Sequence, residues 1–243
     1  MTRSTEAVVL EAGPDKQVGL TLRYSARARR ISLRLDKSSG GAVLVIPHGA
    51  SREQALAFAR SKLDWLDRHL TRLPARQPIR PGTTLPVRGA PVLIRHDSRW
   101  PRMPALVDGQ LRVGGPEDMV SRRLGRWLKE QAGYDLAKPV DRYAEALGVQ
   151  VARISIKDTR RQWGSASRGR NLSFSWRLIL APSFVLDYLA AHEVAHLREM
   201  NHSPRFWALV DGVCRHRQQA EAWLSRHGPG LYAYHLDDAS DRS

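Results

Sequence analysis

The chain has 243 residues, and 42% of them are apolar, which is enough to bury the core of one domain or of two small ones. Its one cysteine, Cys214, excludes an intramolecular disulfide and is typical of a reducing compartment. No apolar run approaches the roughly 20 residues of a membrane span and no secretion signal is visible, so we expect a cytoplasmic protein without membrane contact. The formal net charge of +15 predicts a surface that attracts polyanions, or else a solvated arginine-rich surface with no specific partner.

The first 80 residues predict a β-rich module with one covering helix. Residues 1–17 carry little pattern, and we expect them to fray. Alternation of apolar and polar residues then predicts three strands, at 20–24, 31–35 and 42–46. Small and glycine residues predict a turn at 38–41, between the last two strands.

A capping box marks the start of the covering helix. In Ser51-Arg-Glu-Gln54 the serine hydroxyl can accept the glutamine N–H while the glutamine side chain accepts the serine N–H. Apolar residues then recur at helical spacing to residue 73. Prolines between residues 74 and 82 interrupt the chain, so we predict an N-terminal module at 1–80 and a second module at 81–243.

Short strands and a long helical stretch begin the second module. The strands are predicted at 84–87, 92–96, 105–107 and 110–113. Asp108-Gly109 is a hairpin signal, because both positions of a tight two-residue turn need positive φ. A helical pattern begins after Pro116, continues or restarts at Pro139, and ends with Gly148 as its C-terminal cap.

Two further strands are predicted before the most informative motif, at 151–156 and 171–180. The second alternates, with Leu172, Phe174, Trp176, Leu178 and Leu180 expected on one face and Asn171, Ser173, Ser175 and Arg177 on the other. This alternation is typical of a half-buried strand.

His192-Glu193-Val-Ala-His196 is the motif that carries chemistry. Residues four apart share one face of an α-helix, so the two imidazoles can reach a single ion. A zinc ion held by neutral imidazoles lowers the pKa of its bound water to roughly 7, and Glu193 can accept the proton as that water attacks a carbonyl. The motif therefore predicts one zinc ion and a hydrolase, although the same pattern also arises by chance on amphipathic helices.

A catalytic zinc needs a third protein ligand, and His202 is the strongest candidate. An unbroken helix would place His202 about 80° away from His192 around the axis, so the chain has to turn back. Asn201 can end the helix because asparagine tolerates the left-handed conformation. Ser203-Pro204 can then begin the next helix.

Two residues downstream complete the interpretation. We predict one helix over 206–224, and Glu221 on it is the rival third ligand, because some zinc proteases take a glutamate from a downstream helix. Cys214 lies on the same stretch, and we interpret it as a small buried apolar residue rather than a nucleophile.

The sequence from His192 to Trp207, with Trp163-Gly-Ser165 and Arg177-Leu-Ile-Leu-Ala-Pro182 before it, resembles the YgjP-like metallopeptidase family. That family is related to the SprT-like zinc proteases and more distantly to other zincins. The resemblance implies that His192, His196 and His202 are zinc ligands and that Glu193 is the catalytic base. Many relatives carry a cysteine after Trp-Gly-Ser, whereas this chain has Ala166, so we expect no metal or redox role at that position.

The resemblance also implies that the strand at 171–180 lies along a cleft and pairs with an extended substrate. Candidate cleft residues are Trp163, Gly164, Ser165, Ser175 and Arg177. Between residues 153 and 177 seven Lys and Arg accompany one acid, which predicts a positive rim. Tyr188 and Arg177 are candidates for an additional donor to the oxyanion, and Trp163 is expected in the core rather than stacked on a base.

We therefore predict an α+β fold, with a zincin-like helix module preceded by the β-rich module. The predicted function is zinc-dependent hydrolysis of a peptide or protein substrate. Two alternatives stay open: a nucleoside triphosphate pyrophosphatase or phosphohydrolase that uses the same activated water, and a nucleic-acid-binding module with a structural zinc. The sequence predicts neither the natural substrate nor the oligomeric state.

Overall fold

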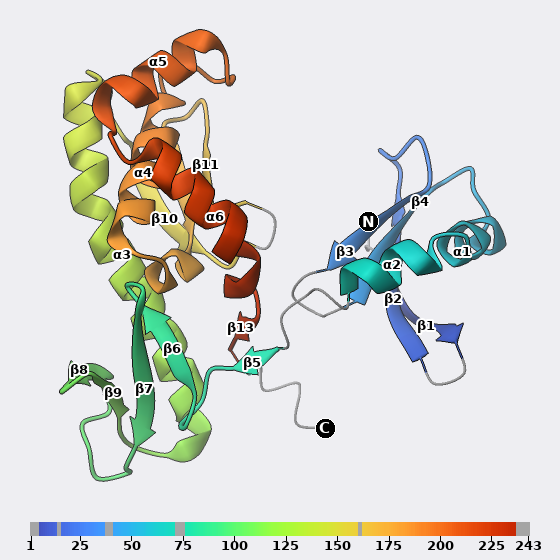
Figure 1. Ribbon diagram of the computed structural model, residues 1–243, viewed down its shortest axis with the longest axis horizontal. Helices are drawn as coiled ribbons and strands as arrows, with labels where there is room; N and C mark the ends of the chain where they lie inside the picture. Colours follow the sequence, from blue (N-terminus) through green and yellow to red (C-terminus); the bar gives the residue numbers. More distant parts are fainter. Residues whose placement is uncertain (1–4, 14–15, 37–40, 71–75, 160–161, 237–243) are drawn as a thin grey trace. The chain divides into compact units, whose positions relative to one another are not determined.

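The computed structural model describes residues 5–13, 16–36, 41–70, 76–159 and 162–236. The chain divides into two compact units, Met1–Arg76 and Gln77–Ser243. The fold is mixed α+β, with sheets in the N-terminal part and helices in the C-terminal part (Figure 1). That each unit is an independent domain, with a boundary at residue 80, stays a prediction.

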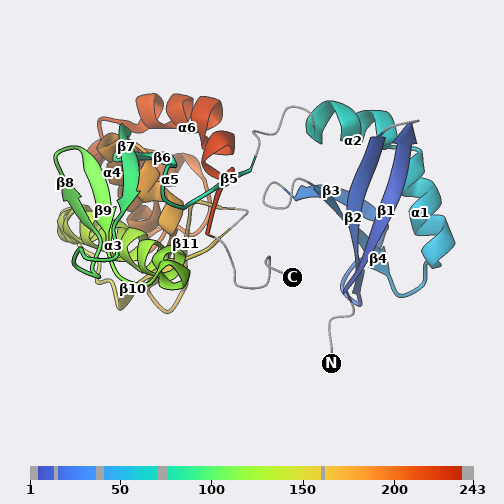
Figure 2. The same ribbon diagram turned by 90° about the horizontal axis from the view of Figure 1, so that it is seen from below.

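The first unit is a four-stranded sheet with two helices on one face (Figure 2). Its elements are β1 (Thr5–Gly13), β2 (Lys16–Ser25), β3 (Ser32–Asp36), β4 (Gly41–Pro47), α1 (Arg52–Arg60) and α2 (Leu63–Leu70). The strand order is β1-β2-β4-β3, with β2 and β4 parallel and the other pairs antiparallel. Alternate residues such as Leu22 and Leu44 point into one core with Leu56 and Leu66 of the helices.

Two predictions for this unit are wrong. Residues 5–13 do not fray but form β1, because pairing with β2 supplies the order that their own sequence pattern does not. The predicted single helix is broken after Arg60, where the Ser61 hydroxyl donates to the Phe58 carbonyl at 2.8 Å and the Lys62 N–H donates to the Ala59 carbonyl at 3.0 Å. Hydrogen bonds between residues three apart are of the 3-10 type, which tightens the last turn of a helix and ends it. The predicted turn at 38–41 lies mostly outside the described residues.

The second unit begins with a second four-stranded sheet. Its strands are β6 (Thr84–Val87), β7 (Ala90–His96), β8 (Ala105–Val107) and β9 (Gln110–Val113), in the order β6-β7-β9-β8. The Asp108-Gly109 hairpin is confirmed, with φ values of 50° and 71°. A second turn of the same kind, at Arg88 and Gly89, also has positive φ at both positions.

One long helix connects this sheet to the rest of the unit. Helix α3 (Val120–Ala146) contacts β9, a second sheet and helix α4 (Ser183–Ala195), and Pro139 lies inside it without ending it (Figure 1). Gly148 has φ of 61° just beyond its end, as expected for the cap. In the part of the chain that the structure describes, no helix is both long and apolar enough to span a bilayer.

The second sheet of the unit has three strands and lies against α4. Its strands are β10 (Arg153–Lys157), β11 (Gly164–Ala166) and β12 (Asn171–Ser175), in the order β10-β12-β11. The remaining elements are two 3-10 turns, η1 (Glu117–Met119) and η2 (Trp176–Leu180), the helices α5 (Pro204–Val213) and α6 (Arg217–Leu231), and the short pair β5 (Gln77–Pro78) and β13 (Tyr234–His235).

Two more predictions fail here, both at element ends. The strand predicted at 171–180 stops at Ser175, and η2 follows with all of its residues buried, so the predicted alternation of faces does not extend beyond the strand. The helix predicted at 206–224 is two helices, because Cys214 adopts an extended conformation with φ of −122° and ψ of 108°. Cys214 itself is only 2% exposed, and burial raises the pKa of its thiol, as expected for a core residue.

The capping box at Ser51 gives a direct test of how α1 is held. Ser51 Oγ accepts the Gln54 N–H at 3.1 Å, and Gln54 Oε1 accepts the Ser51 N–H at 3.0 Å. We expect Ser51→Ala to lower the local stability of α1 by about 1 kcal/mol, because the Gln54 N–H loses its acceptor. Hydrogen exchange of peptides that cover residues 52–60 measures this change. Ser51→Asp retains an acceptor and is the control, and equal protection in all three proteins would contradict the prediction.

Candidate metal centre

Helix α4 carries the first two histidines and is a core helix. Nearly all of its residues after the first turn are buried, including Glu193, and its C-terminal cap is His196. Alanine and leucine at most of these positions favour a helix and leave no polar group to desolvate. The buried helix therefore holds the backbone of His192 and His196 rigidly.

The chain turns sharply after α4 and brings back His202. The side chain of Asn201 accepts the Ser203 N–H at 3.1 Å, and Ser203 Oγ accepts the Phe206 N–H at 3.3 Å to cap α5, with Pro204 in its first turn. The predicted helix start at Ser203-Pro204 is confirmed. The predicted left-handed conformation of Asn201 is wrong, because Asn201 is not among the described non-glycine residues with positive φ. Its side chain makes the turn instead.

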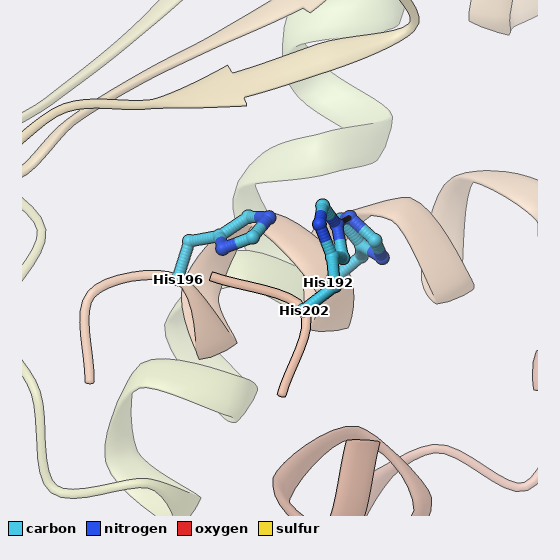
Figure 3. A group of neighbouring side chains, drawn as sticks. All are labelled: His192, His196 and His202. Atoms are coloured by element: carbon cyan, nitrogen blue, oxygen red, sulfur yellow. Dashed lines mark hydrogen bonds between the residues drawn. The ribbon is translucent and has the colours of Figure 1, made fainter. Parts of the chain in front are cut away.

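The three imidazoles converge (Figure 3). One ligand atom from each of His192, His196 and His202 lies within 4.8 Å of the others. The Nε2 atoms of His192 and His202 are 3.1 Å apart, which is roughly the separation of two ligands that share one ion at about 2.1 Å. Three imidazole nitrogens suit zinc and several other divalent transition metals, so the group could hold a metal ion.

Aromatic side chains from α5 support the three rings. Phe206 is fully buried, and its ring centroid lies 4.9 Å, 4.4 Å and 4.8 Å from those of His192, His196 and His202 respectively. Trp207 contacts the rings of His192 and His202 from the same helix, at 5.8 Å and 5.5 Å. Because these apolar rings limit the rotamers of the imidazoles, the three rings are held in place by packing.

Hydrogen bonds to Nδ1 of His192 and His196 determine which ring nitrogen carries the proton. His196 Nδ1 lies 3.1 Å from the Glu199 carbonyl, which can only accept, so Nδ1 carries the proton. The Tyr188 hydroxyl donates to Glu221 Oε1 at 2.9 Å, so His192 Nδ1, at 3.3 Å, donates to the tyrosine oxygen. In both histidines the lone pair of Nε2 is then free for a metal ion.

Burial keeps the imidazoles of His192 and His196 neutral. It lowers the pKa of His192 to about 4, with additional repulsion from His196 and His202, and it also lowers the pKa of His196. Only a neutral imidazole has a lone pair for a metal ion. The site is therefore suited to bind a cation near neutral pH.

Glu193 is a buried carboxyl with an unused oxygen. It is 4% exposed, and burial raises its pKa to about 8. Among the described residues, none forms a hydrogen bond with its buried Oε2. A carboxylate in such surroundings is costly unless a cation or a proton donor accompanies it. This orphaned oxygen and the three imidazoles fit a metal ion with an attached water.

Gly164 provides the space for Glu193. A Cβ added at Gly164 would lie 2.4 Å from Glu193 Oε1 and 2.7 Å from its Cδ, which is closer than any real contact. The strand β11 therefore passes directly over the carboxyl, and only glycine permits this approach. Of the predicted cleft residues, the structure brings Gly164 against Glu193.

The other predicted cleft residues divide into two groups. Ser165 lies half-buried on β11 opposite Ser173, and Trp163 packs on the ring of Tyr232 with centroids 4.7 Å apart. Ser175 and Arg177 are buried, at 0% and 2% exposure, so they do not face a cleft.

Arg177 is a structural residue, which corrects its proposed roles in the positive rim and as an oxyanion donor. Its guanidinium pairs with Asp158, donates to the Tyr234 carbonyl at 3.2 Å and lies 4.5 Å from the Trp176 ring. Arg160 and Arg161 of the predicted rim lie outside the described residues. Exposed basic residues of the rim that are described are Arg153, Lys157, Arg168 and Arg170.

The predictions for Glu221 as a rival ligand and for Tyr188 as an oxyanion donor also change. Glu221, the rival ligand, is outside the group of converging ligand atoms and instead accepts the Tyr188 hydroxyl. Tyr188 contacts Nδ1 of His192, on the far side of the ring from Nε2, so it is not placed to donate to an oxyanion. The sequence offered one signal for this, the spacing of Arg217 and Glu221, which pair at 3.3 Å one helical turn apart.

Comparison with known proteins places the chain in a family. Residues 29–227 match the model of the YgjP-like metallopeptidase domain, and the chain belongs to that family, which confirms the resemblance seen in the sequence. Among solved structures it is similar to the metallopeptidase zymogen abylysin of Pyrococcus abyssi, with 18% identity and a TM-score of 0.34, over 37% of this chain and 93% of that chain. None of the curated proteins compared with it matches.

The tyrosine behind His192 gives a test of how the ligands are oriented. We expect Tyr188→Phe to weaken zinc binding by about 10- to 100-fold, because His192 Nδ1 loses its acceptor. Competition with a chromogenic chelator measures the dissociation constant. The control is Tyr143→Phe, which removes a buried hydroxyl bonded to Asp187 at 2.6 Å and away from the histidines. Equal effects of the two substitutions would contradict an orienting role.

The close approach of β11 gives a second test. We expect Gly164→Ala to destabilise the protein by about 1–3 kcal/mol, because the added methyl group overlaps Glu193. Thermal unfolding measures this loss. Gly212→Ala is the control, since nothing lies within 4 Å of a Cβ there and alanine is favourable inside α5. A Gly164→Ala protein as stable as the wild type would show that β11 does not press on Glu193.

Proposed function

We propose that this protein is a zinc-dependent metallopeptidase with a zincin-like catalytic module. The observation that carries the proposal is the convergence of His192, His196 and His202. The buried carboxyl of Glu193 is adjacent in the chain, and its Oε2 has no hydrogen-bond partner among the described residues. Membership of a metallopeptidase family supports it. In this proposal the three histidines are the ligands and Glu193 is the catalytic base.

The chemistry divides between the ion and the chain. A bound zinc ion would activate water and stabilise the negative charge that develops on the substrate carbonyl. Glu193 accepts a proton at its carboxylate and returns it to the leaving amine, a task for which a pKa near the working pH is best. Burial raises the pKa of this carboxyl to about 8, and a nearby divalent cation favours its charged form and lowers the pKa from that value.

Strand β11 is the best candidate for holding the substrate. It is an edge strand, paired with β12 on one side, and its Gly164 lies against Glu193. An extended peptide that adds to this edge gains main-chain hydrogen bonds without a requirement for sequence. The strand at 171–180, which was predicted to pair with substrate, contributes β12, and β12 already has a partner on each side.

The three-ligand group favours catalysis over a structural role for the ion. In the described part of the chain, the group holds three possible ligand side chains. A tetrahedral zinc then keeps one position for water, whereas a structural site is closed by a fourth protein ligand. The burial of Arg177 removes one of the cations expected to attract a phosphate or a nucleic acid.

Substitution of the proposed base tests the function. We expect Glu193→Gln to lower the rate of peptide hydrolysis by about 10²- to 10⁴-fold, because the amide cannot accept the proton. Bound zinc is expected to stay stoichiometric, since the three imidazoles are intact. Cleavage of an unfolded protein substrate, followed by mass spectrometry, measures the rate, and elemental analysis measures the metal.

The matched control for this test is Glu199→Gln. Glu199 contacts His196 through its backbone carbonyl, so its side-chain charge can be removed without changing that bond. We expect this variant to retain activity. Release of pyrophosphate from nucleoside triphosphates, lost in Glu193→Gln, with no cleavage of any peptide would contradict the peptidase proposal and support the phosphohydrolase alternative.

A further inference from the structure

A hollow of about 990 Å³ lies on the second unit, bordered by α3, α4 and α5. Three of its lining residues, Tyr134, Lys138 and Arg142, follow one another at intervals of four along α3, so they form a row on one face of that helix. Asp187 of α4 and Arg215, just beyond α5, lie across from this row. The volume is within the range of small-molecule binding sites.

This hollow is distinct from the metal centre. At about 100° per residue, His192 lies about 140° around α4 from Asp187, and His196 about 180° from it. Neither histidine is among the residues that line the hollow. A ligand bound here would therefore lie on the opposite side of α4 from the three imidazoles.

The acidic residues of the hollow are already neutralised. Asp135 accepts two hydrogen bonds from Arg88, at 2.7 Å and 2.9 Å. Asp187 pairs with Arg142. Asp211 accepts two bonds, at 3.0 Å and 2.7 Å, from an arginine that does not line the hollow. The acids therefore leave little negative charge for a cationic ligand.

Two cations in the hollow keep their charge uncompensated. Within the described part of the chain, neither Lys138 nor Arg215 forms an ion pair with an acid, and both are exposed. Arg142 keeps 54% of its side chain exposed while it pairs with Asp187, so its guanidinium can donate further. Two uncompensated positive charges and the further N–H donors of Arg142 thus face one space from two sides.

An exposed aromatic ring completes the surroundings. Tyr134 lines the hollow and is 78% exposed, so its ring can contact a bound ligand. We propose that this hollow is a second binding site, for a small organic anion with two or more phosphate or carboxylate groups. Lys138, Arg142 and Arg215 bind the anionic groups, and Tyr134 contacts the body of the ligand.

Binding of defined anions to the full chain tests the proposal. Titration calorimetry at constant ionic strength compares pyrophosphate, citrate and chloride, and the first two distinguish phosphate from carboxylate ligands. We expect saturable binding of at least one of them and none of chloride. Because both anions also bind zinc, the titration is repeated with His192→Ala, which disrupts the metal group and is expected to leave this binding unchanged.

Charge removal then locates the site. The double variant Lys138→Gln with Arg215→Gln is expected to weaken binding by at least roughly tenfold, because charge-assisted hydrogen bonds are lost. Its control is Lys129→Gln, an exposed lysine on the same helix that does not line the hollow. Thermal unfolding checks that all variants fold.

Several outcomes would overturn the proposal. They are the absence of saturable binding, an equal loss of affinity in the Lys129→Gln control, unchanged affinity in the double variant, or loss of binding in His192→Ala. The last of these would assign the anion to the metal centre. None of them depends on peptide hydrolysis, so the proposed function and this second site can fail separately.

Discussion

Burial of α4 in the core is the constraint on which the rest of the structure depends. A helix that packs against α3, η2 and β11 cannot rotate without exposing its apolar residues, so the directions of His192 and His196 are determined by core packing. The same packing places Glu193 under Gly164, where a carboxyl is costly. A buried, unpaired ionisable group in an otherwise apolar region is typical of a functional site.

The site also depends on a hydrogen-bonded chain behind His192. Asp211 binds Arg217, Arg217 binds Glu221, Glu221 accepts the Tyr188 hydroxyl, and Tyr188 accepts the Nδ1 proton of His192. Arg217 also lies over the Trp207 ring, 3.9 Å from its centroid. Its planar guanidinium can bind two carboxylates and stack on an aromatic ring at once, which a lysine cannot do.

The break between α5 and α6 makes this series of hydrogen bonds possible. Cys214 is extended, so α6 begins anew at Arg217 and returns toward α4. In a single continuous helix Asp211 and Arg217 would be six residues apart and on different faces, so they could not pair as they do. The residues around Cys214 therefore position the outer contacts of the three-histidine group, although none of them belongs to that group.

Local sequence was sufficient for the features that depend on neighbouring residues. The α+β class, the Asp108-Gly109 hairpin, the Gly148 cap and the Ser203-Pro204 helix start follow from propensities and short-range hydrogen bonds. The spacing of His192, His196 and His202 predicted one group of imidazoles, and the three rings do converge. Only the tertiary structure decided that Arg177 is buried, that β11 is an edge strand and β12 a central one, and that Glu221 accepts a tyrosine hydroxyl outside the group of three imidazoles. These outcomes depend on contacts between residues far apart in the chain, whose packing no local pattern encodes.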